Sequence, residues 1–155
     1  MRQIWITKAG RPETLVVKEA PDPEPQAGEV RIRVEASGVN FADIMGRMGL
    51  YPDCPPIPTV VGYEVGGRVD AVGIDADPGW VGLDVFAVTR FGGYSDVVCV
   101  PEKQVFARPN GMSALERAAL PVNYLTAWQL VVVMGGLKAG ETMLARLIHP
   151  TDAHC

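Results

Sequence analysis

The stretch GVNFADIMGRMGLYPDCPPIPTVVGYEVGGRVDAVG, residues 38–73, holds the features that decide the fold of this chain. A polar cluster over 40–43 leads into a short helix, which we predict over about 42–48. A proline-rich loop over 50–58 follows, and the stretch ends in a strand over 65–72. Glycines interrupt this strand, which is typical of bends or of places where two backbones come close together.

Short strands with alternating polarity surround this stretch. Apolar residues at 30, 32 and 34 alternate with charged residues, so 30–36 is predicted to be an antiparallel strand with one face in solvent. Residues 3–7 and 14–18 are separated by a turn and predict a hairpin. Further strands are expected over 83–88, 94–100 and 105–107. The order of elements therefore predicts a mainly β domain with some helix.

The sequence changes character after residue 112. The motif Ser113-Ala-Leu-Glu116 is a capping box, which predicts the start of a helix that Pro121 breaks. Residues 122–134 are apolar and end at two glycines, so we predict a long buried helix there. Residues 142–148 have the composition of a strand.

The composition fits one soluble domain. The 155 residues are 48% hydrophobic, which is enough for one core, and the formal net charge is −4. Nucleic-acid binding is not expected, because basic residues neither exceed the acidic ones nor cluster. The apolar window Ala118–Met134 is interrupted by polar residues and is shorter than the roughly 20 residues that a membrane span needs.

Three cysteines, Cys54, Cys99 and Cys155, stand far apart in the sequence. Their odd number and the lack of CxxC spacing indicate neither a disulfide framework nor a structural zinc site. The N-terminal residues carry charges where a secretory signal needs an apolar run. We therefore expect a protein of the reducing cytoplasm.

Polar groups near the ends of predicted strands are the first candidates for a site. Asn40 and Asp43 could line a cleft, or they could be a helix N-cap and a surface carboxylate. Tyr63 and Glu64 have two similar interpretations: cleft residues, or a tyrosine packed on a barrel and a glutamate in a local hydrogen bond. Tyr51 could anchor its loop or stack on a planar ligand.

Other positions are less specific. Thr126 lies in the apolar stretch 122–134, where a threonine hydroxyl more often bonds a carbonyl one turn earlier than a ligand. The tail contains metal-binding residue types whose spacing matches no standard zinc pattern: His149, Asp152, His154 and Cys155. No G-x-S-x-G, Gly-Lys-Ser/Thr or G-x-G-x-x-G motif occurs, which argues against a serine hydrolase and a P-loop enzyme.

Three motifs occur in an order that is characteristic of a known family. GYEVGG at 62–67, followed by Gly73, resembles the zinc-alcohol-dehydrogenase signature. GVNFAD at 38–43 is similar to the block in which zinc enzymes carry a cysteine ligand. NYLTAW at 123–128 resembles the helix that joins the catalytic and coenzyme domains. The chain thus resembles the medium-chain dehydrogenase/reductase superfamily, and most closely its zinc-free quinone oxidoreductase branch, which includes vesicle-membrane-protein-like members.

The resemblance extends from Met1 to about Leu144 and implies a fold. The expected fold is a GroES-like, partly open β-barrel with linking helices and a stub of a Rossmann strand. The implied domains are a GroES-like, alcohol-dehydrogenase-type domain over 1–121 and, over 122–155, the linking helix with the truncated start of a coenzyme-binding domain.

Departures from the zinc enzymes indicate the branch. Asn40 stands where the cysteine ligand would be, and Tyr63 stands where the histidine would be. A neutral amide and a phenol are poor zinc ligands, and the four-cysteine structural lobe is also missing. The resemblance therefore implies that no metal is bound. Met45 stands where a second pocket tyrosine is often found, which weakens the case for a strong general acid.

The same resemblance implies a reaction. In this branch NADPH carries the hydride, and a small-molecule quinone or enone is reduced. Asn40 and Tyr51 match the catalytic pocket, and Asn40 and Thr126 match positions near the nicotinamide. The full-length form is expected to be a homodimer.

The tail and the apolar stretch leave alternatives open. A dinucleotide site needs a glycine-rich turn for its pyrophosphate, and none occurs here, so little activity is expected of this chain alone. The tail is consistent with a truncation or a frameshift. A second hypothesis is a non-catalytic GroES-like interaction module, or a self-associating fragment, that uses the apolar stretch 118–134. A third is a remnant that barely folds.

Overall fold

The computed structural model describes residues 1–109 and 111–144 of the 155-residue chain. The chain divides into two compact units, Met1–Leu125 and a second unit that begins at Thr126. Each unit is described by itself. The strands of the described residues all belong to the first unit.

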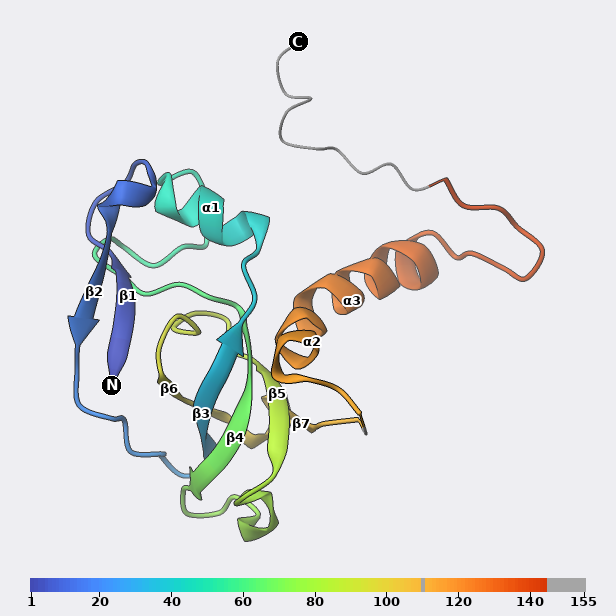
Figure 1. Cartoon of the computed structure of the whole chain (residues 1–155). Helices are drawn as coiled ribbons and strands as arrows, with labels where there is room; N and C mark the ends of the chain where they lie inside the picture. Colours follow the sequence, from blue (N-terminus) through green and yellow to red (C-terminus); the bar gives the residue numbers. More distant parts are fainter. Residues whose placement is uncertain (110, 145–155) are drawn as a thin grey trace. The chain divides into compact units, whose positions relative to one another are not determined.

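These strands form two antiparallel sheets (Figure 1). The strands are β1 (Arg2–Ile6), β2 (Leu15–Glu19), β3 (Glu29–Ser37), β4 (Glu64–Val72), β5 (Asp84–Val88), β6 (Val97–Pro101) and β7 (Val105–Ala107). The smaller sheet is the β1–β2 hairpin, and the larger runs in the order β6-β3-β4-β5-β7. The larger sheet curls into part of a barrel, which confirms the predicted mainly β class and the partly open GroES-like barrel.

Strand β3 lies between β4 and β6 and shows the predicted alternation. Val30 and Ile32 are fully buried, whereas Arg33 is exposed on the other face. The buried residues of β3 join a cluster of mostly valine side chains from the neighbouring strands. The members of this core are Val30, Ile32, Val65, Val69, Val85, Ala87, Val98, Val100 and Val105.

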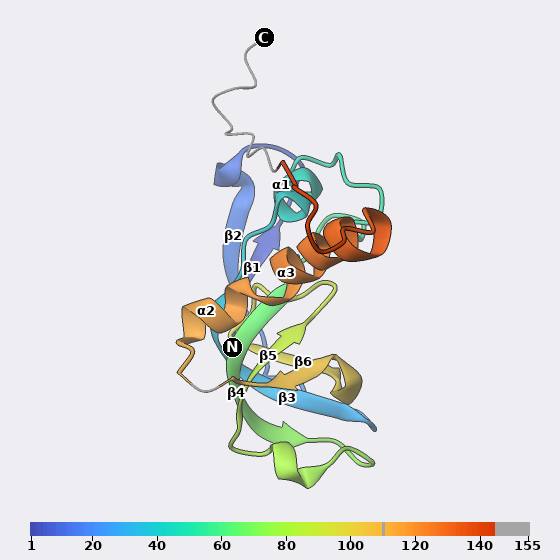
Figure 2. The ribbon, with the colours of Figure 1, turned by 90° about the vertical axis from the view of Figure 1, so that its right-hand side faces the viewer.

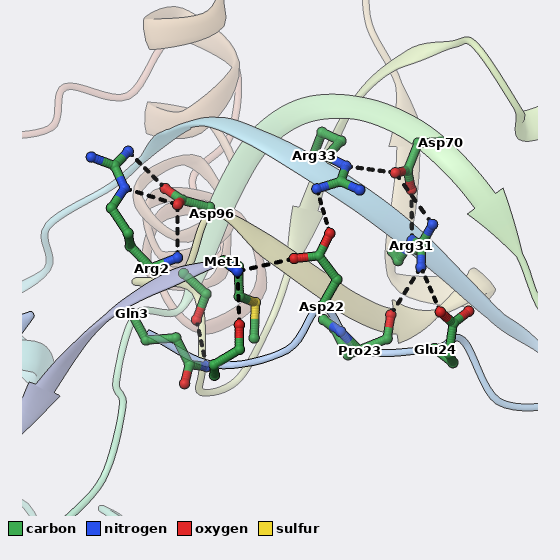
Figure 3. Close-up of polar contacts among 12 residues, drawn as sticks. Met1, Arg2, Gln3, Asp22, Pro23, Glu24, Arg31, Arg33, Asp70 and Asp96 are labelled. Atoms are coloured by element: carbon green, nitrogen blue, oxygen red, sulfur yellow. Dashed lines mark hydrogen bonds and ion pairs between the residues drawn. The ribbon is translucent and has the colours of Figure 1, made fainter. Parts of the chain in front are cut away.

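Arginines on the outer face of β3 bind it to β4 and to the proline-rich loop that follows β2 (Figure 3). Arg31 Nε donates to Asp70 Oδ1 at 2.8 Å, and Arg33 Nε donates to Asp70 Oδ2 at 2.6 Å. Arg33 also forms an ion pair with Asp22 at 2.6 Å. Burial acts to raise the pKa of Asp70, but the hydrogen bonds and charges of the two arginines outweigh it and hold that pKa below its ordinary value.

Gly67 explains why glycines interrupt β4. A Cβ at this position would lie 2.1 Å from the carbonyl oxygen of Arg33 on β3. The β3–β4 pairing also shifts register between Val34 and Ala36. Shifts of this kind bend and twist a strand pair. The predicted close backbone approach is therefore confirmed, and it occurs where the sheet curls.

Short helical segments connect the strands and follow the last of them. They are η1 (Pro12–Thr14), α1 (Phe41–Arg47), η2 (Pro78–Trp80), η3 (Glu102–Gln104), α2 (Ala114–Ala119), α3 (Pro121–Trp128) and the π-helical η4 (Gln129–Met134). Helix α1 lies beside the turn of the β1–β2 hairpin (Figures 1 and 2), where Gly10 N donates to Arg47 O at 3.0 Å.

Helix α2 begins as the sequence predicts. Ser113 and Glu116 form the expected capping box, in which Ser113 N donates to Glu116 Oε2 at 2.8 Å. The buried Arg117 then fixes α2 to the large sheet. Its Nη1 donates to Gly67 O at 2.9 Å, and its Nη2 donates to Glu35 Oε2 at 2.6 Å. The guanidinium therefore has partners on both β3 and β4.

The prediction of a buried helix over 122–134 is wrong in one respect. The helix forms, as α3 and η4, but its large side chains are exposed: Tyr124 by 69%, Trp128 by 61% and Met134 by 72%. An apolar composition shows that burial of the helix would be favourable. It does not show which other part of a protein buries it. Among the described residues, no helix has the length and apolar character needed to cross a membrane.

The predicted strand over 142–148 is described only in part. Residues 142–144 form no strand, and residues 145–148 lie outside the described residues. The same holds for the candidate metal-binding residues of the tail, His149, Asp152, His154 and Cys155.

Candidate functional site

The site is built around the first turn of α1. Asn40 is the N-cap residue of this helix, with extended backbone angles, and Asp43 is the third helical residue of a capping box. Asp43 Oδ2 accepts a hydrogen bond from Asn40 N at 2.9 Å. The N-cap interpretation of Asn40 is therefore correct for its backbone.

The side chain of Asn40 has a second role. It is 8% exposed, and its Nδ2 donates to Glu64 Oε1 at 2.9 Å. A carboxylate can only accept, so the amide nitrogen, not the amide oxygen, faces Glu64. A residue that begins a helix is thus joined to a residue that begins β4.

Glu64 is the most deeply buried acidic side chain of the described residues, at 1% exposure. Its second oxygen, Oε2, accepts from Val122 N in the first turn of α3 at 2.7 Å. The expectation of a local hydrogen bond is wrong, because the two partners are 24 and 58 residues away. Buried carboxylates need such donors, since desolvation of an unpaired charge is costly.

Gly38 provides the space for Glu64. A Cβ at Gly38 would lie 2.2 Å from Glu64 Oε1 and 2.6 Å from Glu64 Cδ. No side chain other than hydrogen fits there while the glutamate keeps its position. The close packing of Glu64 therefore requires glycine at position 38.

Asp43 is the second buried acid of the site, at 3% exposure, so it is not the surface carboxylate that was one of its two interpretations. Its Oδ1 accepts from Gly62 N at 2.9 Å. Burial raises the pKa of Asp43, and hydrogen bonds from Asn40 and Gly62 oppose this only in part. The carboxyl group ties α1 to the chain that approaches β4.

Tyr94 lies close to Asp43 and was not a candidate from the sequence. Its hydroxyl is buried and finds no hydrogen-bond partner among the described residues. Burial, followed by the charge of Asp43, raises the pKa of Tyr94 well above its ordinary value. Tyr94 and Asp43 are far apart in the sequence, so no local pattern predicts that they meet.

Tyr51, Tyr63 and Phe91 form an aromatic cluster. The Tyr51 and Tyr63 rings meet edge to face with centroids 6.2 Å apart, and Tyr63 lies 5.2 Å from Phe91. Such geometry is favourable for aromatic pairs. The Tyr63 hydroxyl is buried without a partner among the described residues, and burial raises the pKa of Tyr63 well above its ordinary value. Tyr51 therefore anchors its loop on Tyr63, the residue next to Glu64.

Some of the predicted site residues lie in contact with one another, and others do not. Asn40 and Glu64 are in direct contact, and Tyr51 is joined to them through Tyr63. Thr126 is exposed on α3 and belongs to the second unit, so its approach to Asn40 stays a prediction. Within residues 1–109 and 111–144, no three His, Cys, Asp or Glu side chains gather in a way that could hold a metal ion.

A cavity of about 550 Å³ lies beside this site. Asp43 and Tyr94 line it, but Asn40 and Tyr51 do not. Its walls are mostly aliphatic and come from the hairpin, from β3 and from α1. They include Ile4, Ile6, Leu15, Val17, Val34 and Ile44.

Comparisons with known proteins identify the family to which this fold belongs. Residues 26–110 match the family described as the alcohol dehydrogenase GroES-like domain. The synaptic vesicle membrane protein VAT-1 homolog of Rattus norvegicus is 41% identical over 149 residues, which is 95% of this chain and 37% of the relative.

Two solved structures extend the comparison. The human synaptic vesicle membrane protein VAT-1 homolog-like protein matches with a TM-score of 0.86 and 36% identity, over 90% of this chain and 45% of that chain. Escherichia coli quinone oxidoreductase, solved in complex with NADPH, matches with a TM-score of 0.78 and 31% identity, over 84% of this chain and 40% of that chain.

The curled barrel and its sequence motifs define a GroES-like domain of the kind found in oxidoreductases. The chain belongs to the alcohol dehydrogenase GroES-like family, within the medium-chain dehydrogenase/reductase superfamily. It spans less than half the length of each of the three relatives named above.

Proposed function

We propose that this chain supplies the catalytic-domain side of a zinc-free, NADPH-dependent reductase of quinones or enones. The observation that carries the proposal is the buried Asn40 amide, joined to Glu64 at 2.9 Å where the zinc enzymes of the superfamily carry a cysteine ligand. The NADPH complex of the Escherichia coli quinone oxidoreductase supports the choice of coenzyme.

Asn40 is suited to bind a carbonyl oxygen. Its Nδ2 carries two N–H groups, and one of them donates to Glu64. The second N–H can donate to the oxygen of a quinone or an enone, and such a bond is worth most where charge develops on that oxygen. Tyr51 would line the same pocket from its loop.

The residues of this chain fit the nicotinamide end of the coenzyme but not its pyrophosphate. Asn40, and Thr126 by resemblance, could contact the nicotinamide, which when bound supplies the hydride. The sequence contains no glycine-rich turn for the pyrophosphate. This chain alone is therefore expected to bind NADPH weakly and to turn over slowly.

The donor chemistry of the site supports a reaction without zinc. Zinc selects thiolate, imidazole or carboxylate ligands, and an amide such as Asn40 is a poor substitute. Tyr63 could bind a metal only as a phenolate, and burial raises its pKa well above the ordinary value. Neither residue at the two positions thus offers a ligand that zinc prefers.

The remaining parts of the proposal concern the whole protein. A reducing, cytoplasmic setting is consistent with the free thiols of Cys54 and Cys99. A domain boundary between 121 and 122, and a homodimeric full-length form, follow from the resemblance alone.

Ligand binding tests this proposal. Duroquinone, a quinone with no free ring position, is titrated into the chain, into Asn40→Ala and into Asn123→Ala, which changes an exposed asparagine. Loss of one hydrogen bond predicts roughly fivefold to tenfold weaker binding by Asn40→Ala and no change in Asn123→Ala. Equal affinity of all three proteins would remove Asn40 from the pocket. NADPH consumption at ordinary enzyme rates would contradict the account of the coenzyme.

A second candidate function is self-association or partner binding by a non-catalytic module. The exposed apolar side chains of α3 and η4 favour it, since such surfaces mark interfaces or aggregation. Light scattering after size-exclusion chromatography separates the two hypotheses. A monomer across a wide concentration range argues against this candidate.

A further inference from the structure

We propose that Glu64 is a positioning residue, which fixes the orientation of the Asn40 amide and so decides which hydrogen-bonding group a ligand meets. The inference rests on the proposed function for the identity of the ligand. The orientation itself rests only on contacts within the first unit.

The carboxylate determines the direction of the amide. Glu64 Oε1 and Asn40 Nδ2 are 2.9 Å apart, and a flipped amide would place two acceptor oxygens at that distance. Because neither oxygen would carry a proton between them, the flipped form is strongly disfavoured. The amide nitrogen therefore stays on the Glu64 side, and Oδ1 stays on the other side of the amide group.

Glu64 is itself held from three directions. Val122 N donates to Oε2 at 2.7 Å, Asn40 donates to Oε1, and the backbone at Gly38 packs against the end of the side chain. At 1% exposure, the Glu64 side chain is almost completely enclosed by protein. The backbone of Asn40 is fixed in turn by Asp43 Oδ2 at 2.9 Å.

This arrangement has a chemical consequence. One N–H of Asn40 is used by Glu64, and the other remains as the donor for a ligand. A carbonyl oxygen fits that donor, whereas a group that must itself donate does not. Glu64 thus selects for a carbonyl ligand without touching it, and it does so by excluding the other amide orientation.

The substitution Glu64→Gln is the direct test. Val122 N still needs an acceptor, so the oxygen of the introduced glutamine is expected to face Val122 and its NH₂ group to face Asn40. The Asn40 amide should then flip, because its oxygen becomes the better partner. The exposed Glu19→Gln makes the same chemical change away from the site.

Side-chain amide NMR reports the orientation without any need for activity. In the unchanged chain, one Asn40 N–H is expected downfield and slow to exchange, as befits a bond to a buried carboxylate. Glu64→Gln should remove this signal, and Glu19→Gln should leave it in place. An unchanged Asn40 signal in Glu64→Gln would overturn the inference.

A double-variant cycle provides a second readout, which remains informative if Glu64→Gln folds poorly. Asn40→Asp places two carboxylates in contact and should lower the Tm by about 5–10 °C. Adding Glu64→Gln to Asn40→Asp should restore most of that loss, because the introduced glutamine can donate to the introduced aspartate. Losses that simply add would overturn the proposed pairing.

Ligand binding then separates this inference from the proposed function. Glu64→Gln should bind duroquinone roughly fivefold to tenfold more weakly than the unchanged chain. If the Asn40 signal responds as expected but neither protein binds a quinone or an enone, the orientation stands and the proposed function fails. If the signal does not respond, the orientation fails whatever the ligand does.

Discussion

Asp43 Oδ1 accepts a hydrogen bond from the backbone N–H of Gly62 at 2.9 Å. This bond joins two parts of the stretch 38–73, because Asp43 belongs to the first turn of α1 and Gly62 precedes β4. The same carboxyl group also accepts from Asn40 N. A single buried side chain therefore holds the polar cluster against the start of the strand, and the rest of the site is arranged around it.

Replacing Asp43 by asparagine should destabilise the fold. The amide offers one acceptor oxygen where two backbone N–H groups need acceptors, so one buried donor is left unpaired. We expect a loss of about 1–3 kcal/mol in the free energy of unfolding, measured by urea denaturation. The exposed Asp53→Asn serves as control. A loss below about 0.5 kcal/mol, the ordinary range for surface changes, would show that the bonds to Asp43 contribute little.

The ion-pair network on β3 and β4 should make stability depend on acid. The pKa of Asp70 is lowered in the folded state, so its contribution is present above the ordinary pKa of about 3.9 and is lost as the pH falls through the folded pKa. Asp70→Asn should cost about 1 kcal/mol at pH 7, a modest value because the pair is partly exposed.

This cost should vanish as the unchanged chain is acidified from about pH 5 to pH 2. Chemical denaturation at several pH values measures the difference between the two proteins. The exposed Asp75→Asn should show no such trend. A difference that grew with falling pH would have the wrong sign for a carboxylate stabilised by Arg31 and Arg33.

Gly38→Ala should disturb Glu64 more than the small change in volume suggests. The new Cβ would lie 2.2 Å from Glu64 Oε1, and the carboxylate would have to leave both of its donors. We expect a loss of about 1–3 kcal/mol, typical of overpacking, together with loss of the Asn40 amide signal. Gly79→Ala, in the exposed segment η2, is the matched control. An unchanged Asn40 signal would mean that Glu64 adapts elsewhere.

The thiol of Cys99 should react slowly. Burial, followed by the charge of Glu29, raises the pKa of Cys99 to about 11. Only the thiolate is nucleophilic, so alkylation by iodoacetamide at pH 8 should be roughly a hundredfold slower than for a free thiol. Mass spectrometry of the tryptic peptide that contains Cys99 gives the rate, with glutathione as the reference. Labelling as fast as that of glutathione would contradict the half-buried position of Cys99.

The parts of the fold that depend on neighbouring residues are predictable from the sequence. The alternation at 30–36 predicts β3 because a strand has a period of two, and the Ser113 capping box predicts α2 because both partners lie in one turn. The contacts of Glu64 with Asn40 and Val122 are not predictable in this way, since no local period relates residues so far apart. The sequence also leaves open whether the helix over 122–134 is buried or exposed, because composition does not reveal what covers an apolar surface.

The most direct test of the central claim compares two ligands at the same positions. Duroquinone and zinc chloride are titrated in turn while the Asn40 side-chain amide and the Tyr63 ring signals are followed by NMR. We predict that duroquinone shifts the Asn40 amide signal saturably and that micromolar zinc leaves the signals of both residues unchanged. Saturable zinc shifts at Asn40 and Tyr63, with no response to the quinone, would contradict it.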